Sequence, residues 1–158
     1  MNSVFAITTH HENPLDAAEA WRECNVCAIG HFEEENPNRI AFDGINQGDL
    51  ILAYSCHNRI AYVGEIKDGI LHKRNKNIVS DETRKGFGYP FQYEVNWYDK
   101  PHHFSRKELP NDLWTQLGKR GKTVVQIEVD GKKEMNAKSF GKLKERLRKV
   151  RAGWGHRR

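Results

Sequence analysis

Two short runs of metal-ligating residue types stand near the start of the chain. Residues 10–12 read His-His-Glu, and Cys24 and Cys27 form a Cys-x-x-Cys pair. Neighbouring side chains of a strand point to opposite faces, so His10 and His11 would converge on one ion only if the chain turns there. A structural zinc site takes four ligands, and no second pair at metal-ligand spacing follows. We therefore expect no metal and no cofactor, and predict that both cysteines are buried thiols.

The sequence also lacks the motifs of common hydrolytic and phosphate chemistry. It contains no Gly-x-Ser-x-Gly motif, no phosphate-cradling glycine loop and no His-Glu-x-x-His. The histidines at positions 72, 102, 103 and 156 have no evident carboxylate partner in the sequence and are predicted to be solvated. The chain is therefore expected not to be an enzyme.

Aromatic residues interleaved with basic ones indicate a different chemistry. Residues 84–91 read Arg-Lys-Gly-Phe-Gly-Tyr-Pro-Phe. Stacking of a base on an aromatic ring contributes about 1 to 3 kcal/mol, and a nearby cation binds the phosphate. Phe87 and Tyr89 are candidate stacking residues, whereas Phe91 is expected to lie in the core. The alternative is that Tyr89 only covers one end of the fold.

Basic charge is concentrated at the C-terminal end. The formal net charge is +5, yet residues 142–158 alone carry eight basic side chains and one acidic side chain. Such a segment binds phosphate without reading sequence, or is simply solvated. The length of 158 residues fits one domain, and three cysteines do not make a disulfide framework. Because no apolar run approaches the roughly 20 residues of a membrane span and no secretory signal is recognisable, a cytoplasmic location is expected, with no membrane partner.

These residues must be positioned by a chain in which strands dominate. A helix beginning at Asn13 and Pro14 is expected between the first two strands, with Trp21 and Cys24 on its inward stripe. Residues 67–90 are predicted to form a long polar loop, and residues 31–47 an irregular stretch with one helical turn. Strands are expected at 3–8, 25–29, 48–55, 59–66, 91–99 and 119–129, and helices at 110–118 and 139–153.

An all-strand middle with short turns predicts a small barrel rather than a doubly wound sheet, which would need a helix after almost every strand. The expected class is α+β, with a helix after the first strand and an amphipathic helix at the end. Residues 1–150 are expected to form the domain, and residues 151–158 a basic tail.

The order of these elements resembles the EVE and YTH branch of the PUA-like superfamily. Residues 3–30 are similar to the opening of YTH domains, where a strand ends in a polar run finishing in His-Glu-Asn before the first helix. Residues 48–66 are similar to the EVE hairpin, where Gly-Asp precedes an apolar strand and the partner strand carries Val-Gly. The resemblance implies a PUA-like β-barrel that holds a modified base in an aromatic pocket.

The resemblance also implies roles for individual residues. Asn13 matches the asparagine that hydrogen-bonds the base edge, with Thr9 and His10 beside it, and the backbone of Ala28 matches a carbonyl that accepts from a methylated amine. Cys27 takes the place of a cage tryptophan, so Phe32, Phe87 and Tyr89 are the available walls. Backbone phosphates are expected to be bound by Lys73, Arg74, Lys85, Lys119, Arg120 and Lys122.

The expected function is that of a reader that holds a modified, flipped-out nucleobase, in DNA. It would act as a stand-alone protein or as a module of a McrB-type modification-dependent restriction protein, with a fused or associated nuclease or motor. Extruding the base costs a few kcal/mol, which pocket and phosphate contacts must offset. Three alternatives stay open: an RNA-binding PUA-like domain, a metal-dependent enzyme using the His-His-Glu and Cys-x-x-Cys residues, and a module whose tail binds any polyanion.

Overall fold

The computed structural model describes residues 1–8, 21–30, 33–55, 60–73, 91–98, 102–103, 116 and 123–149. Within these residues the strands are β1 (Asn2–Thr8), β2 (Val26–Ile29), β3 (Leu50–Ser55), β4 (Ile60–Ile66), β5 (His72–Lys73), β6 (Phe91–Trp97), β7 (His102–His103), β8 (Val124–Ile127) and β9 (Glu134–Met135). The helices are α2 (Pro37–Asp43) and α4 (Ala137–Lys149), and residues 21–24 are also helical.

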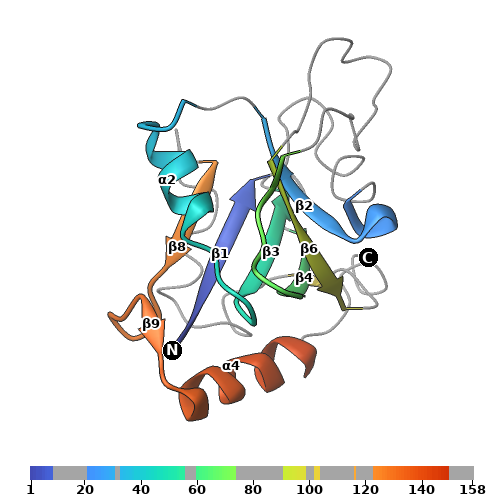
Figure 1. Ribbon diagram of the computed structural model, residues 1–158. Coiled ribbons are helices and arrows are strands. Elements are labelled where there is room, and N and C mark those ends of the chain that lie inside the picture. The colour runs from blue at the N-terminus through green and yellow to red at the C-terminus, as the bar shows by residue number, and fades with distance from the viewer. Residues whose placement is uncertain are drawn as a thin grey trace.

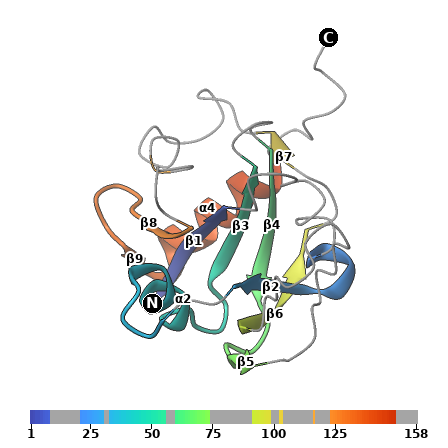
Figure 2. The same cartoon turned by 90° about the horizontal axis from the view of Figure 1, so that it is seen from above.

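All the described strands belong to one mixed sheet. Its main order is β2-β6-β4-β3-β1-β8, with β5 paired to β6, β7 to β4 and β9 to β1. Only β1 and β3 pair in parallel among the described strands, and β3 and β4 form the expected antiparallel hairpin. The sheet curls, as Figures 1 and 2 show, so that the ribbon of β2, β6 and β5 lies opposite α4 across β1, β3 and β4. The expected mixed α+β class and the predominance of strands are confirmed.

The central strands β1, β3 and β4 bury both of their faces. The inner face contributes side chains such as Phe5, Ile7 and Ile51 to a core shared with β2, β6 and α2. The outer face contributes Val4, Leu50 and their neighbours to a second core, which α4 covers. This two-sided burial explains why these strands read as nearly continuous apolar runs rather than as a polar alternation.

The Gly-Asp pair at positions 48 and 49 fastens the entry to β3. Gly48 has a φ of +83°, a conformation that side-chain-bearing residues rarely adopt. The Asp49 carboxylate is buried and accepts hydrogen bonds from the backbone N–H of Ser3 (2.9 Å) and of Asn46 (2.8 Å). This carboxylate therefore ties the start of β1 to the turn that leads into its parallel partner.

Helix α2 forms where only an irregular stretch with one helical turn was expected. Asn36 caps it, because its side-chain oxygen accepts from the backbone N–H of Asn38 at 2.8 Å, and Pro37 opens the first turn. Phe42 is fully buried, and the hydroxyl of Tyr93 on β6 donates to its carbonyl at 2.9 Å. An asparagine-proline pair like the one on which the helix start at Asn13 was predicted thus begins α2 at Asn36.

Helix α4 matches the predicted C-terminal amphipathic helix. Phe140, Leu143 and Leu147 are buried against the outer face of the sheet, while the other side of the helix is charged and exposed. The side chain of Asn136 accepts from the backbone N–H of Ser139 at 2.9 Å, which satisfies an amide of the first turn. None of the described helices is long and apolar enough to cross a membrane.

Other expectations divide between the described and the undescribed parts of the chain. Trp21 is buried as expected, whereas Cys24 is exposed, so the prediction of two buried thiols is wrong for Cys24. The polar segment 67–90 contains strand β5. The start of the first helix at Asn13, the segment 110–118 apart from Gln116, and the tail 151–158 lie outside the described residues.

Candidate functional site

Several strand ends meet at the N-terminal half of α2. The side-chain oxygen of Asn38 accepts from the backbone N–H groups of Thr123 (2.8 Å) and Val124 (3.0 Å) at the start of β8. The backbone N–H of Thr8, at the end of β1, donates to the carbonyl of Thr123 at 2.8 Å. The next residue along α2, Arg39, reaches the start of β6. Helix α2 therefore joins the end of β1 to the beginning of β6 across the curled sheet (Figure 1).

The contact between Arg39 and β6 is a stacked pair. The guanidinium carbon of Arg39 lies 3.8 Å from the ring centroid of Phe91, and both residues are buried. The Arg39 Nε donates to the Asp43 carboxylate at 2.7 Å, which holds the guanidinium plane in place. A planar cation suits such stacking better than a lysine would. Phe91 is thus a core residue, as predicted, and Arg39 fixes the point where β6 begins.

Strands β5, β6 and β2 form a ribbon at the same place. Lys73 pairs with Phe91, and Phe91 pairs with Ile29 on the other side. The exposed Lys73 ammonium lies 5.6 Å from the Phe91 ring centroid. Residues 74–90, which include Phe87 and Tyr89, connect Lys73 to Phe91. Because these two residues are cross-strand partners, the two ends of this segment lie side by side.

The ladder between β2 and β6 settles which way the backbone of Ala28 points. The N–H of Val95 donates to the carbonyl of Asn25 at 2.9 Å, so these residues form a hydrogen-bonded pair at the start of the ladder. Bonded and non-bonded pairs alternate along an antiparallel ladder, so the pair Ala28–Gln92 is non-bonded. The N–H and carbonyl of Ala28 therefore point away from β6, to the edge of β2 that no described strand pairs with.

Three of the predicted site residues lie in the described part of the chain, and all three belong to this ribbon. Ala28 and Lys73 are placed as described above, and Cys27 lies opposite Tyr93 with its side chain in the inner core. The other predicted residues, Thr9, His10, Asn13, Phe87, Tyr89, Arg74, Lys85, Lys119, Arg120 and Lys122, lie outside the described residues, as does Phe32. At least one end of each of their segments nevertheless joins the fold beside a strand end near α2, at Thr8, Gly30, Lys73, Phe91 or Thr123.

The two cysteines of the Cys-x-x-Cys pair have opposite environments. Cys27 is fully buried, and burial raises the pKa of its thiol to about 12, whereas Cys24 is exposed. Because the thiolate is the reactive form, we expect iodoacetamide at pH 8 to alkylate Cys24 in the folded protein and to leave Cys27 unmodified. Peptide mass mapping checks this, and equal labelling of both residues without denaturant would contradict it. The pair is poorly built for redox exchange or zinc ligation.

Asn38 and Arg39 are the site-positioning residues that the sequence did not reveal. Both fall in the stretch predicted to be irregular, although Asn36 and Pro37 carry the same start signal that was recognised at Asn13 and Pro14. That signal would have located α2. The contacts of Asn38 with residues 123 and 124, far along the chain, have no local signature.

The basic charge of α4 lies elsewhere. Lys144 pairs with Glu65 on β4, and Arg148 lies 3.5 Å from the same carboxylate and 4.9 Å from the Tyr98 ring centroid. These cations therefore help to hold α4 on the outer face of the sheet. Of the predicted base-binding residues, Cys27 and Ala28 are described, and both belong to the inner core, on the other side of the sheet from α4.

Comparison with known proteins supplies a fold relationship. No protein-family model matches the chain, and no curated protein matches it significantly. Among solved structures, the fold is similar to the YTH domain of the MRB1 protein of Zygosaccharomyces rouxii, solved in complex with N6-methyladenosine RNA. The TM-score is 0.51 with 14% sequence identity, and the match covers 96% of this chain and 90% of that one. At this identity the likeness shows a shared fold, which agrees with the YTH resemblance of the sequence.

Proposed function

We propose that this chain is a non-enzymatic PUA-like reader that holds a modified nucleobase, extruded from its strand, at the strand ends gathered around α2. The observation that carries the proposal is the backbone of Ala28. It points to the edge of β2 that no described strand pairs with, at the position that the YTH resemblance assigns to a base contact. The shared fold with a YTH domain bound to a methylated RNA supports it independently.

The chemistry follows from groups that surround this edge. The carbonyl of Ala28 accepts a hydrogen bond from the base, and Asn13, which follows β1 in the sequence, reads its edge. Phe87 and Tyr89 stack on the base, and the Arg39–Phe91 stack fixes the strand end from which their segment departs. Lys73, exposed beside this strand end, binds phosphate together with the basic residues of the flanking segments.

Two kinds of nucleic acid are candidates. DNA is proposed from the resemblance to modules of modification-dependent restriction proteins, which extrude the base from a duplex. RNA is the second candidate, favoured by the ligand in the similar solved structure. In RNA the bases of single-stranded loops are already unstacked, so less free energy is spent on extrusion.

A binding panel tests the proposal. Duplex DNA and single-stranded RNA of matched sequence would each carry one central base that is unmodified, 5-methylated, 5-hydroxymethylated or N6-methylated, at one fixed salt concentration. We expect one modification to be preferred by tenfold or more, roughly 1.4 kcal/mol, in one of the two polymers. Equal affinity for every oligonucleotide, combined with a steep salt dependence, would instead identify a module that binds any polyanion.

A further inference from the structure

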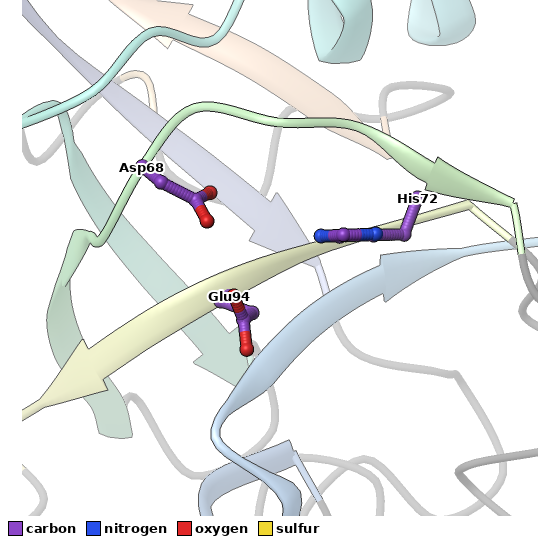
Figure 3. A group of neighbouring side chains, drawn as sticks. All are labelled: Asp68, His72 and Glu94. Atoms are coloured by element: carbon purple, nitrogen blue, oxygen red, sulfur yellow. The ribbon is translucent and has the colours of Figure 1, made fainter.

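Three potential metal-ligating side chains converge beside the stem of the β5–β6 hairpin. Asp68, His72 and Glu94 each offer one ligand atom, and these atoms all lie within 4.8 Å of one another. In Figure 3 the imidazole ring of His72 points toward the two carboxylates. The expectation that His72 lacks a carboxylate neighbour is therefore wrong, because the fold brings two of them to it.

Each of the three residues is positioned by the local fold. Asp68 lies in the turn after β4, where its carboxylate accepts from the backbone N–H of Ile70 at 3.0 Å. Gly69, with a φ of +72°, packs so closely on residues 46 and 47 that an added Cβ would lie 2.6 Å from the Gln47 nitrogen. His72 is opposite Gln92, and Glu94 is two residues further along β6, so the two share one face of the ribbon.

An ordinary ion pair does not account for His72. Its Nε2 is buried, yet it has no hydrogen-bond partner among the described residues. A buried ring nitrogen without a partner is unfavourable, so it marks a place where a further group is expected. The ligand atoms of His72 and of the two carboxylates all lie within 4.8 Å of one another.

We propose that Asp68, His72 and Glu94 together bind one divalent transition-metal ion, with Zn²⁺ as the reference ion. One imidazole and two carboxylates are ligands that Zn²⁺ accepts, and their summed charge of −2 balances the ion. An ion about 2.1 Å from each ligand requires ligand atoms no more than about 4.2 Å apart, which is within a small side-chain rotation of the observed arrangement. Three protein ligands leave the remaining positions to water.

The site joins three successive parts of the hairpin stem. Asp68 precedes β5, His72 is on β5 and Glu94 is on β6, so the ion would clamp both sides of the stem from which residues 74–90 depart. Ion binding by these three residues does not depend on the proposed reader function. We expect it to raise the midpoint of thermal unfolding, because an ion that binds the folded state alone stabilises it.

Calorimetric titration of the metal-free protein with Zn²⁺ tests the site. We expect the wild type to bind one equivalent of Zn²⁺, and His72→Ala and Glu94→Gln each to lower the affinity for it at least tenfold. Losing even a residue that only hydrogen-bonds to a metal ligand lowers metal affinity by about 10- to 100-fold. Glu134→Gln, an exposed carboxylate on β9, is the matched control and should leave the titration unchanged. The double variant His10→Ala/His11→Ala tests whether Zn²⁺ is bound by the His-His-Glu run instead. We expect this variant also to bind one equivalent of Zn²⁺ with wild-type affinity.

The proposal would be overturned if both His72→Ala and Glu94→Gln gave the wild-type titration curve. It would also be overturned if only the His10→Ala/His11→Ala variant lost the binding of Zn²⁺. Folding of each variant is verified by circular dichroism before titration. Should His72→Ala fail to fold, the nearly isosteric Glu94→Gln and the wild type still decide the matter. In the wild type, the side-chain nitrogen resonances of His72 are expected to shift on Zn²⁺ addition and to stay unchanged on Mg²⁺ addition, because imidazole suits Zn²⁺ and not Mg²⁺. Unchanged His72 resonances with Zn²⁺ would exclude it as a ligand.

Discussion

Replacing Asn38 by alanine is expected to lower the free energy of unfolding by about 2 to 3 kcal/mol. The Asn38 side-chain oxygen accepts from two backbone N–H groups, those of Thr123 and Val124. Within the described part of the chain, no other side chain of α2 hydrogen-bonds to β8. A donor left unpaired away from water costs about 1 to 3 kcal/mol, and these two are partly buried. Chemical denaturation, monitored by tryptophan fluorescence, measures the change.

The matched control is Asn38→Asp, which keeps an oxygen acceptor at the same place. It also puts a negative charge in the first turn of α2, where the helix dipole favours one. We expect this variant to unfold within about 0.5 kcal/mol of the wild type, as surface substitutions that spare such contacts do. If Asn38→Ala were as stable as Asn38→Asp, the two hydrogen bonds would not hold α2 against β8.

Replacing Gly64 by alanine is expected to destabilise the protein by about 3 kcal/mol. A Cβ at this position would lie 2.5 Å from the Val95 Cγ1, 2.8 Å from the Trp97 Cε3 and 3.0 Å from the Asn96 carbonyl oxygen. Val95 is 1% exposed, so its side chain has no room to move away. Overpacking of this kind typically costs 1 to about 3 kcal/mol. The glycine of the Val-Gly pair in β4 is therefore required for packing, because β6 approaches it too closely to leave room for a side chain.

The control for this substitution is another glycine, Gly141 in the middle of α4. An added Cβ at Gly141 meets nothing within 4 Å, and the residue is exposed. Gly141→Ala should therefore raise the free energy of unfolding by roughly 0.5 to 1 kcal/mol, the difference in helix propensity. Thermal and denaturant unfolding of both variants are compared under the same conditions. Similar changes at the two positions would show that Gly64 is not packed as described.

The parts of the fold that the sequence predicted are those with a local periodic signal. The apolar alternation of β6 and the stripe of Phe140, Leu143 and Leu147 in α4 both led to the observed burial. The β3–β4 hairpin followed from two apolar runs with a short polar break. Each of these signals lies within about 20 residues, so it could be read without knowing the fold.

Features that depend on the curl of the sheet could not be predicted in this way. The contacts of Asn38 and Arg39 with strands 50 to 85 residues away give α2 its role, and nothing near α2 in the sequence announces them. Likewise, Glu94 reaches His72 only because β5 and β6 are paired. Cys24 is a case where a local periodic signal was misleading. The helical stripe predicted that Cys24 points inward, but the helix ends at this residue and its side chain is exposed.

The most direct test of the reader function compares the wild type and Asn13→Ala on one pair of oligonucleotides, the preferred modified ligand and its unmodified twin. If the base edge is read at the end of β1, Asn13→Ala loses the tenfold preference, about 1.4 kcal/mol, and retains the salt-dependent affinity for the unmodified strand. Circular dichroism and thermal unfolding confirm that the variant is folded. An unchanged preference in folded Asn13→Ala, or an equal loss of affinity for both oligonucleotides, would contradict the proposed site.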